Sequence, residues 1–515
     1  MRTFLGMAAN QAVDHEAIQV QGIPGARLMA AAGEAVVEAA EVAGLLNDPD
    51  DQQILLLAGK GNNGGDAFVV AGLLHDRGYG VKVLAIPAAD QIKGDALHHF
   101  KRAVEAGVPM IHWREDLDPH PLFAEASLIF DGLLGTGISG DIRPPYDILI
   151  PLVNDAGVPV VAIDVPSGVS GDTGEILIPC IQAELTVSMG FGKLGTLFDP
   201  ARSRAGRVVV ADIGFPENVL ERIDAVPTYE VFPGDFSLHL LARPRDAHKY
   251  QVGKVLIVAG APGFSGAAIL AARAAGRSGA GLVRLAVPET IAPIAETASL
   301  ETVVEACPQT SSGGFSLAAE DRLRELADWA DVVAWGPGLG RQSETLDLTR
   351  RLLTDIQAPL VLDADGLYAL HGHLELLHDR PAPTLLTPHL GEFRTVLGMD
   401  SKEPVTWETA TQFAADHQVM LLLKGAPSLI ATPDGRFYVN STGHAGLATG
   451  GSGDVLTGIL AGLWSQCDTL PDILNLAMVK HGECADLLRD IKGILGLLAG
   501  DLVETLPEVL KDFGA

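Results

Sequence analysis

The chain has 515 residues, of which 47% are hydrophobic and 20% are charged, and its formal net charge is −29 at pH 7. This length exceeds one ordinary hydrophobic core, so we expect two folded domains, with three as the alternative. The acidic surplus argues against a nucleic-acid-binding protein, which needs clustered Lys and Arg, but not against a nucleotide bound through backbone amides.

The first half of the chain alternates helical and strand patterns. A helical stripe covers residues 26–46, and an apolar run at residues 54–58 leads into Gly59-Lys-Gly-Asn-Asn-Gly-Gly-Asp66. Further helices are expected at residues 67–77 and 93–106, and further strands at 81–86, 128–130, 160–163, 185–188 and 208–212. Short buried strands alternating with helices indicate a parallel sheet covered on both faces. We therefore expect a Rossmann-like, doubly wound α/β domain over residues 1–225.

A break in the pattern, rich in proline, separates this half from a second α/β series. We place a linker at residues 226–246 and a second domain at residues 247–515. Strands are expected at residues 254–258, 282–287, 331–335, 360–363, 385–387 and 420–423. An alanine-rich helix at residues 267–278 should pack closely, and residues 428–439 predict a β-hairpin that turns at Pro433-Asp434-Gly435.

Three motifs of the first domain follow predicted strands. They are Asn62-Asn-Gly-Gly-Asp66, the segment from Asp131 to Asp141, and Asp164-Val-Pro-Ser-Gly168. Each alone is also what an ordinary strand–helix turn looks like, but ligands of doubly wound sheets bind beyond the carboxyl ends of the strands. Three such motifs at one edge favour a site that can cradle phosphate. Oxygen atoms of Asn63, Asp131 and Ser167 could also hold a cation, and a single carboxylate suits a monovalent ion better than Mg²⁺.

The most informative motif of the second domain is Gly446-Leu-Ala-Thr-Gly-Gly-Ser-Gly-Asp454, which leads into a helical pattern. Backbone N–H groups of such a loop, with the helix N-terminus, can bind an anion. Asp454 would then lie beside a bound hydroxyl as a base or an orienting group. This arrangement is typical of phosphoryl transfer.

Four other strand-end motifs accompany it. Gly336-Pro-Gly-Leu-Gly340 lets backbone approach a ligand, and Asp363-Ala-Asp365 either meets magnesium-bound phosphate or caps a helix. His389 and Glu392 stand at a helix start, where Glu392 could be a cap. Lys424 ends a strand, where a lysine is often only solvated but could also reach phosphate oxygens.

These motifs together resemble two known families. The stretches that resemble the ADP-dependent NAD(P)H-hydrate dehydratases, which have the ribokinase-like fold, are His248-Lys-Tyr-Gln-Val-Gly253, Ser265-Gly-Ala-Ala268, Ser278-Gly-Ala-Gly-Leu282, Gly336–Gly340, Asp363–Leu367, Thr387–Glu392 and Ala448–Leu456. Those that resemble the NAD(P)H-hydrate epimerases are Gly22-Ile-Pro-Gly25, Gly61–Asp66, Asp131 with Gly135-Thr-Gly137, and Asp164–Gly168. The resemblance covers nearly the whole chain, in the order of the bifunctional repair enzymes.

The resemblance implies a substrate that composition alone does not reveal. Hydrated NADH or NADPH (NADHX or NADPHX) carries water added across a ring double bond, with the hydroxyl on C6 in two epimers. The first domain would interconvert the R and S forms. The second would dehydrate the S form at the expense of ADP, giving AMP and phosphate. In this step the C6 hydroxyl would attack the β-phosphorus of ADP, while Asp454 deprotonates or orients that hydroxyl.

The resemblance also implies roles for individual residues. In the epimerase site, the hydrate would contact Asn62, Asn63, Gly64, Gly65, Asp66, Gly135, Thr136, Gly137, Ile138, Ser139, Gly140, Asp141 and the catalytic Asp164, with potassium on Asn63, Asp131 and Ser167. In the dehydratase site, Gly338, His389 and the catalytic Asp454 would face the hydrate. The adenine nucleotide, with magnesium, would bind Lys424, Gly425, Ala426, Pro427, Ser428 and Gly453.

Four positions depart from the family pattern. Ala67 replaces a usual glycine, His444 an asparagine, Leu447 a methionine and Ser428 a threonine. These mild changes affect details of ligand binding rather than activity.

Two alternatives stay open at this stage. One is a small-alcohol (vitamin-precursor) kinase of the ribokinase-like fold, fused to a non-catalytic nucleotide-binding domain. The other is a repair enzyme whose first domain only binds ligand.

The cellular context follows from the cysteines and the hydropathy. Cys180, Cys307, Cys467 and Cys484 are scattered without metal-binding spacing, as in a reduced cytoplasmic protein. The N-terminal residues lack the long apolar run of a signal peptide, and no uncharged stretch reaches the length of a membrane span. We expect a cytoplasmic homo-oligomer of undetermined size whose partners are small nucleotides, with no nucleic acid and no membrane.

Overall fold

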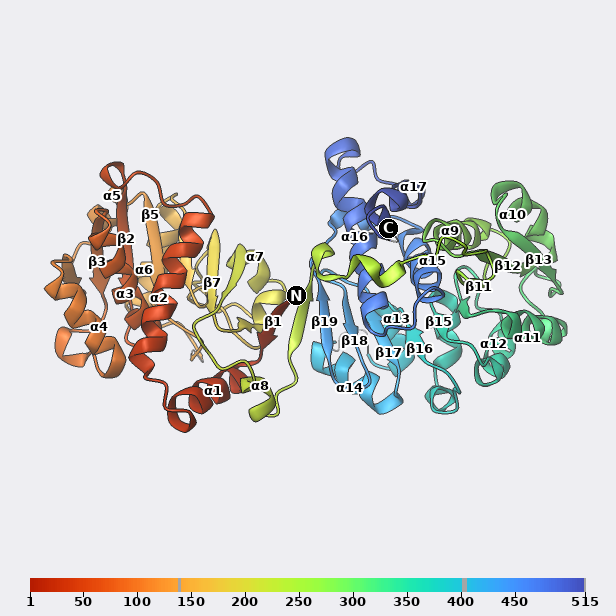
Figure 1. Cartoon of the computed structure of the whole chain (residues 1–515), viewed down its shortest axis with the longest axis horizontal. Coiled ribbons are helices and arrows are strands. Elements are labelled where there is room, and N and C mark those ends of the chain that lie inside the picture. Colours follow the sequence, from red (N-terminus) through yellow and green to blue (C-terminus); the bar gives the residue numbers. More distant parts are fainter. Residues whose placement is uncertain (138–139, 401–404, 514–515) are drawn as a thin grey trace. The chain divides into compact units, whose positions relative to one another are not determined.

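The computed structural model describes residues 1–137, 140–400 and 405–513 of the chain. Two compact units are present: one comprises Arg2–Tyr229, and the other Glu230–Ala515 together with Met1. The division between Tyr229 and Glu230 falls inside the range proposed for the linker, residues 226–246. We call them the N-terminal unit and the C-terminal unit and describe each by itself (Figure 1).

The N-terminal unit is built on a seven-stranded parallel sheet of order β4-β3-β2-β5-β6-β7-β9. Its strands are β2 (Gln53–Ala58), β3 (Gly80–Ala85), β4 (Met110–His112), β5 (Leu128–Gly132), β6 (Val160–Ile163), β7 (Leu185–Met189) and β9 (Arg207–Ala211). A separate parallel pair joins β1 (Arg2–Leu5) to β8 (Gly192–Lys193). Its helices are α1 (Met7–His15), α2 (Gly25–Val42), α3 (Asn62–Asp76), α4 (Gly94–Glu105), α5 (His120–Glu125), α6 (Tyr146–Asp155), α7 (Ala201–Ala205) and α8 (Val219–Arg222).

Alternate residues of β2 show how both faces of this sheet are covered. Ile54, Leu56 and Ala58 join one hydrophobic cluster with residues of α2, α3 and α4. Leu55 and Leu57 point to the opposite face and join a second cluster with α5 and α6. Because both faces are packed, the strand reads as a continuous apolar run rather than an alternating one.

The C-terminal unit has a larger sheet of related design. Seven parallel strands run in the order β13-β12-β11-β14-β15-β16-β17, and the antiparallel strands β18 and β19 follow. The strands are β11 (Lys254–Val258), β12 (Leu282–Pro288), β13 (Val303–Cys307), β14 (Val332–Trp335), β15 (Leu360–Leu362), β16 (Thr384–Leu386), β17 (Met420–Leu423), β18 (Leu429–Ala431) and β19 (Phe437–Asn440), and β10 (Thr228–Val231) spans the division between the units. The helices are α9 (Ser265–Arg277), α10 (Ala292–Ala298), α11 (Glu320–Trp329), α12 (Ser343–Asp355), α13 (Leu390–Leu397), α14 (Trp407–His417), α15 (Ser452–Trp464), α16 (Asp472–Lys492) and α17 (Ala499–Leu510).

Helices α9 and α15 pack unusually closely. A Cβ atom added at Gly458 of α15 would lie 2.2 Å from the carbonyl oxygen of Ala271 in α9, and one at Gly462 would lie 2.7 Å from that of Ala275. The small residues of both helices allow this approach, as the alanine-rich sequence predicts. The packing fixes the position of the N-terminus of α15.

Several predicted elements agree with the structure and a few do not. The α/β class of both halves and the hairpin of β18 and β19 are confirmed, whereas β1, β4, β8, β10 and β13 were not predicted. Helix α3 begins at Asn62 instead of residue 67, so the prediction that Asn62–Asp66 precede a helix is wrong. Glycines at residues 64 and 65 obscured the helical pattern, although both are buried inside the first turns of α3.

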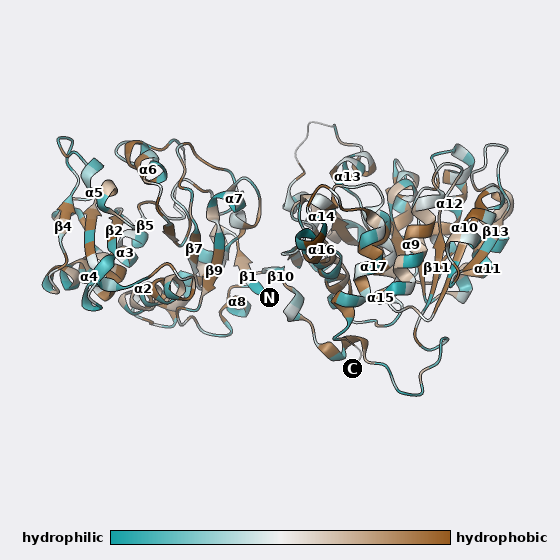
Figure 2. Ribbon diagram, turned by 90° about the horizontal axis from the view of Figure 1, so that it is seen from above, coloured by the Kyte–Doolittle hydropathy of each residue, from teal (hydrophilic) through white to brown (hydrophobic). Residues whose placement is uncertain are grey.

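The distribution of hydropathy agrees with this architecture. Strands such as β2 and β11 are hydrophobic along most of their length, whereas the helices carry both hydrophilic and hydrophobic residues (Figure 2). Across residues 1–137, 140–400 and 405–513, no helix combines the length and the apolar character that crossing a membrane requires.

Candidate active sites

The three predicted motifs of the N-terminal unit meet at the carboxyl edge of its sheet. Asn63 lies in the first turn of α3 after β2, Asp131 lies in β5, and Ser167 follows β6. The order β2-β5-β6 makes these strands neighbours, so their ends lie side by side.

Asn63, Asp131 and Ser167 form one buried network. The amide N–H and Oγ of Ser167 donate to the two carboxylate oxygens of Asp131 at 2.8 and 2.7 Å, and the N–H of Leu133 donates at 3.2 Å. Nδ2 of Asn63 donates to the carbonyls of Ile163 and Leu134 at 2.7 and 3.3 Å. Burial raises the pKa of Asp131 to about 6, against the opposing effect of these hydrogen bonds. No basic side chain among the described residues pairs with Asp131, which is fully buried.

Asp164 is held in an unusual backbone conformation by a buried lysine. Its φ is 67°, a left-handed value that is rare for a residue with a side chain. Lys193 Nζ forms an ion pair with Asp164 Oδ1, and the N–H of Met189 donates to the same oxygen at 3.1 Å. Lys193 Nζ also donates to the carbonyls of Met189 and Phe191 at 3.3 and 3.1 Å. The contacts from Lys193 and Met189 therefore hold Asp164 in its strained backbone conformation, and such strain is common at functional sites.

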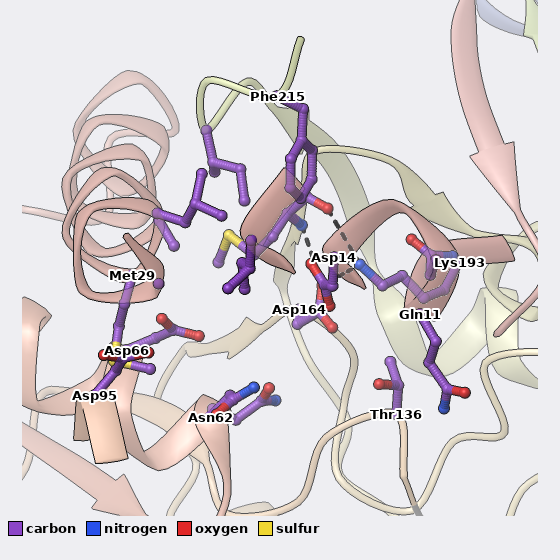
Figure 3. Close-up of a pocket in the computed structure, with 18 of the residues that line it drawn as sticks. Gln11, Asp14, Met29, Asn62, Asp66, Asp95, Thr136, Asp164, Lys193 and Phe215 are labelled. Carbon is purple, nitrogen blue, oxygen red and sulfur yellow. Dashed lines mark hydrogen bonds and ion pairs between the residues drawn. The ribbon is translucent and has the colours of Figure 1, made fainter. Parts of the chain in front are cut away.

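A cavity of about 160 Å³ opens beside this pair (Figure 3). Of the predicted residues, Asn62, Asn63, Asp66, Thr136 and Asp164 line it. The lining also includes side chains that the sequence reasoning missed, namely Asn10, Gln11, Asp14, Met29, Asp95, Lys193 and Phe215.

Three predicted glycines of this site lie so close to neighbouring atoms that a side chain would not fit. A Cβ at Gly64 would lie 2.1 Å from the carbonyl oxygen of Gly59, and one at Gly135 would lie 2.7 Å from Asn63 Oδ1. A Cβ at Gly65 would lie 2.6 Å from the side chain of Met29. Gly137, Gly140 and Asp141 are exposed, and Ile138 and Ser139 lie outside the described residues.

In the C-terminal unit, the predicted motifs again gather at the carboxyl edge of a sheet. Gly336 follows β14, Asp363 follows β15, His389 lies after β16, and Lys424 follows β17. These four strands are consecutive neighbours in the sheet.

Lys424 links this edge to helix α15. Its Nζ donates to Asp363 Oδ1 at 2.7 Å and lies 3.9 Å from Glu392 Oε2. Thr457 of α15 donates to the other oxygen of Asp363 at 2.6 Å. A Cβ at Gly453 would lie 3.4 Å from Lys424 Nζ. The Asp363 carboxylate, only 1% exposed, therefore joins Lys424 to helix α15 and does not cap a helix.

Asp454 lies in the first turn of α15, and its pKa is raised to about 7. Burial is the main cause, followed by the charge of Asp363, while Lys424 opposes the rise. A carboxyl with a pKa near neutrality suits a general base.

His389 and Glu392 form a capping box at the start of α13. His389 Nδ1 accepts from the N–H groups of Gly391 and Glu392 at 3.0 and 3.2 Å, and Glu392 Oε2 accepts from the His389 N–H at 2.9 Å. Because Nδ1 accepts, the proton of a neutral His389 is on Nε2. The capping interpretation of Glu392 agrees with this geometry, and the His389 side chain is 58% exposed.

The remaining predicted residues of the second site lie in two loops. Gly338 has φ 61°, and a Cβ there would lie 2.8 Å from Cβ of Phe264. Gly425, Ala426, Pro427 and Ser428 connect β17 to β18, where Ser428 Oγ accepts from the Gly425 N–H at 3.3 Å and donates to its carbonyl at 3.1 Å.

Ser452, the first residue of α15 and part of the Gly446–Asp454 motif, contacts a buried histidine that the sequence reasoning missed. Nε2 of His481 lies 3.1 Å from the carbonyl oxygen of Ser452 and 3.3 Å from its Oγ. Burial lowers the pKa of His481 to about 4, so it is neutral at physiological pH.

Comparison with known proteins relates each unit to a family. Residues 255–508 match the family model described as NAD(P)H-hydrate dehydratase, and residues 25–195 match the one described as YjeF-related protein N-terminus. A ribokinase-like superfamily protein from Enterococcus faecalis V583 is 22% identical, with a TM-score of 0.50, over 56% of this chain and 97% of its own. Fold and sites thus define a two-unit α/β enzyme whose C-terminal unit has the ribokinase-like fold.

Relatives over the full length identify the family. The bifunctional NAD(P)H-hydrate repair enzyme of Salinibacter ruber is 39% identical over 99% of this chain and 96% of its own length. The corresponding enzyme of Moorella thermoacetica is 38% identical over 95% of this chain and 93% of its own length. The chain belongs to the family of bifunctional NAD(P)H-hydrate repair enzymes. This relation does not favour the alternative of a small-alcohol kinase fused to a non-catalytic domain.

Proposed function

We propose that the chain repairs hydrated NADH and NADPH in two steps, one in each unit. The N-terminal unit epimerises the R and S hydrates at C6. The C-terminal unit dehydrates the S hydrate to NADH or NADPH and converts ADP to AMP and phosphate. Full-length relatedness to repair enzymes and two separate strand-end sites support this assignment.

The observation that carries the dehydratase step is the position of Asp454, with its pKa of about 7, in the first turn of α15. Hydroxide is a poor leaving group, whereas phosphate is a good one. Asp454 takes the proton from the C6 hydroxyl as that oxygen attacks the β-phosphorus of ADP and AMP departs. Loss of phosphate from C6 and of a proton from the adjacent ring carbon C5, which passes to water, then restores the ring double bond.

The surroundings of Asp454 suit the nucleotide in this step. The first N–H groups of α15 lack intrahelical partners and point toward an anion at the helix start. Lys424, beside Gly453, adds a positive charge for the transferred phosphoryl group. The loop of Gly425–Ser428 extends from Lys424 and would contact the rest of the nucleotide. Gly338 and the exposed face of His389 then bind the hydrate.

Magnesium fits this site only as a companion of the nucleotide. Three of the carboxylates already have protein partners: Asp363 contacts Lys424 and Thr457, Asp365 contacts Arg341, and Glu392 contacts the His389 N–H. Within the described residues, no group of three or more His, Cys, Asp or Glu side chains is placed to hold a metal ion. The nucleotide phosphates and water would therefore hold most of the magnesium coordination sphere.

Potassium fits the N-terminal unit. The fully buried Asp131 carboxylate has no basic partner among the described residues, and an uncompensated buried charge is costly. A monovalent cation held by oxygen atoms of Asn63, Asp131 and Ser167 would supply the countercharge. It would also fix the loops that carry Thr136 and Asp164 around the cavity.

A single incubation tests both activities. Mixed R and S hydrates are incubated with ADP and magnesium, and absorbance of the reduced nicotinamide is followed. We expect complete conversion faster than spontaneous epimerisation, whereas Asp164→Asn should stall once the S form is consumed. Asp454→Asn should give no rapid conversion but should still equilibrate the epimers. Accumulation of a stable phosphorylated alcohol would contradict the dehydratase assignment.

The cytoplasmic location, expected from the scattered cysteines, and the homo-oligomeric state stay predictions. Cell fractionation and light scattering of the purified chain test them.

A further inference from the structure

The cavity of the N-terminal unit is lined by more carboxyl groups than basic side chains. Four carboxyl groups line it, those of Asp14, Asp66, Asp95 and Asp164, and Lys193 is the only basic side chain among its described lining residues. Asp66 lies beside Asp95 and Met29, while Asp14 and Asp164 lie close to Lys193 (Figure 3). Because the proposed substrate carries phosphate groups, this surplus must serve the reacting ring and not the phosphates.

Asp66 is the unexplained member of this set. It is 6% exposed and has no hydrogen-bond partner among the described residues, yet it lines the cavity. Burial and the charges of Asp164 and Asp14 raise its pKa well above the ordinary value. An unpartnered buried carboxyl facing a cavity is a group available to donate a proton.

Asp164 differs from Asp66 in its partners. Its Oδ1 accepts from Lys193 and from the Met189 N–H, contacts that stabilise a carboxylate. No donor among the described residues contacts Oδ2. Asp164 is thus an anchored anion with one oxygen left for a ligand, and Lys193 is its positioning residue.

We propose that epimerisation breaks and re-forms the C6–O bond through a ring cation, with Asp66 protonating the departing hydroxyl and Asp164 accepting a proton from the incoming water. This proposal rests on the proposed epimerase function. It assigns different roles to two residues that face one cavity.

The step balances as follows. C6 of the hydrate is bonded to the ring nitrogen N1, whose lone pair forms a C6=N1 double bond as the C6–O bond breaks. The hydroxyl leaves as water with the proton of Asp66. A second water adds its oxygen to the opposite face of C6, the π electrons return to N1, and Asp164 accepts the surplus proton. Proton transfer through water in the cavity from Asp164 back to Asp66 resets the site.

The charge of the cavity favours this route over the obvious competitor. Removal of the hydrogen on C6 would create a carbanion, which the carboxylates of Asp14, Asp95 and Asp164 would repel. A ring cation is instead attracted by the same groups, in a cavity where partial burial weakens solvent screening. The site therefore suits a positive intermediate.

Isotopes distinguish the two routes with the unaltered full-length protein. One hydrate epimer is incubated without ADP, so that the dehydratase is idle, in water enriched in oxygen-18 and separately in deuterium oxide. The other epimer is separated and its mass is measured by mass spectrometry. A protein-free sample is the control for spontaneous exchange of oxygen or hydrogen with the solvent. We expect one oxygen-18 atom for each epimerisation and no deuterium at C6. Retention of the original oxygen, or deuterium at C6, would overturn the proposal.

Variants test the assigned residues in the same assay. Asp66→Asn and Asp164→Asn should each slow epimerisation by about 10²–10⁴-fold, the usual loss for a positioned acid or base. The matched control is Asp76→Asn, at the exposed far end of α3, which should retain the wild-type rate. A wild-type rate in Asp66→Asn would overturn its role. Absence of any catalysed epimerisation by the unaltered protein would instead refute the proposed function itself.

Discussion

Replacing Asp454 by asparagine should impair dehydration and at the same time stabilise the C-terminal unit. Burial, with the repulsion of Asp363, raises the pKa of Asp454 from 3.8 to about 7. At about 1.36 kcal/mol for each pKa unit, this makes the charged form about 4 kcal/mol less favourable in the folded protein than in the unfolded chain. Asparagine keeps the shape of the side chain without the charge, so the variant avoids this cost.

The sign of the pH dependence follows from the folded pKa lying above the unfolded one. The cost of the charged group is complete above about pH 7 and fades as the pH falls toward about 4. The free energy of unfolding of Asp454→Asn should therefore exceed that of the wild type by about 4 kcal/mol at about pH 8.5, and by about 2 kcal/mol at about pH 5.

Urea unfolding followed by tryptophan fluorescence measures this difference. Trp329, Trp335, Trp407 and Trp464 lie in the C-terminal unit, and only Trp113 lies in the other. Asp468→Asn, an equal change of charge at an exposed position beyond the far end of α15, is the control. Dehydration of the S hydrate by Asp454→Asn should fall by about 10²–10⁴-fold. A variant no more stable than wild type at the higher pH, or one whose gain is independent of pH, would refute the reasoning.

Three further changes probe other parts of the molecule. Lys424→Met leaves the buried Asp363 carboxylate without its cation and should destabilise the C-terminal unit by about 3–5 kcal/mol in urea unfolding, whereas adding Asp363→Asn should recover much of the loss. Replacing potassium by choline should slow epimerisation, measured by separating the epimers, and leave dehydration of the S hydrate unchanged; equal rates of epimerisation in both salts would argue against the cation site. Gly458→Ala places a Cβ 2.2 Å from the Ala271 carbonyl oxygen and should cost about 1–3 kcal/mol by overpacking, while Gly500→Ala, which has open space, should cost far less.

The sequence predicts the fold well because buried parallel strands leave a clear signal. The run at residues 54–58 is apolar on both faces, and the structure shows why: its alternate residues enter two different clusters. The boundary of α3 could not be predicted in the same way. Gly64 and Gly65 break the helical pattern, yet a Cβ at either would collide with Gly59 or Met29, so tertiary packing overrides their low helix propensity.

The candidate sites were predictable only where residues follow strands that the sequence reveals. Asp164 and Lys424 each follow a predicted strand directly. Lys193 lies four positions after the end of β7, so the same rule extended to that strand would have found it. Gln11 and Asp14 reach the cavity from α1. This helix is far from Asp164 in the sequence, and no spacing of residues indicates that the two lie close together.

The two sites share an electrostatic arrangement that their unrelated motifs conceal. In each, a lysine contacts one well-buried carboxylate, Lys193 with Asp164 and Lys424 with Asp363, while a second carboxyl, Asp66 or Asp454, has its pKa raised by burial. Both proposed reactions act on the same C6–O bond next to N1, and both leave C6 electron-poor as that bond breaks. A carboxyl whose pKa is raised suits proton transfer to or from a substrate, and the lysine pairs with the other carboxylate beside it. A common substrate atom thus accounts for a common arrangement of charge on two different folds.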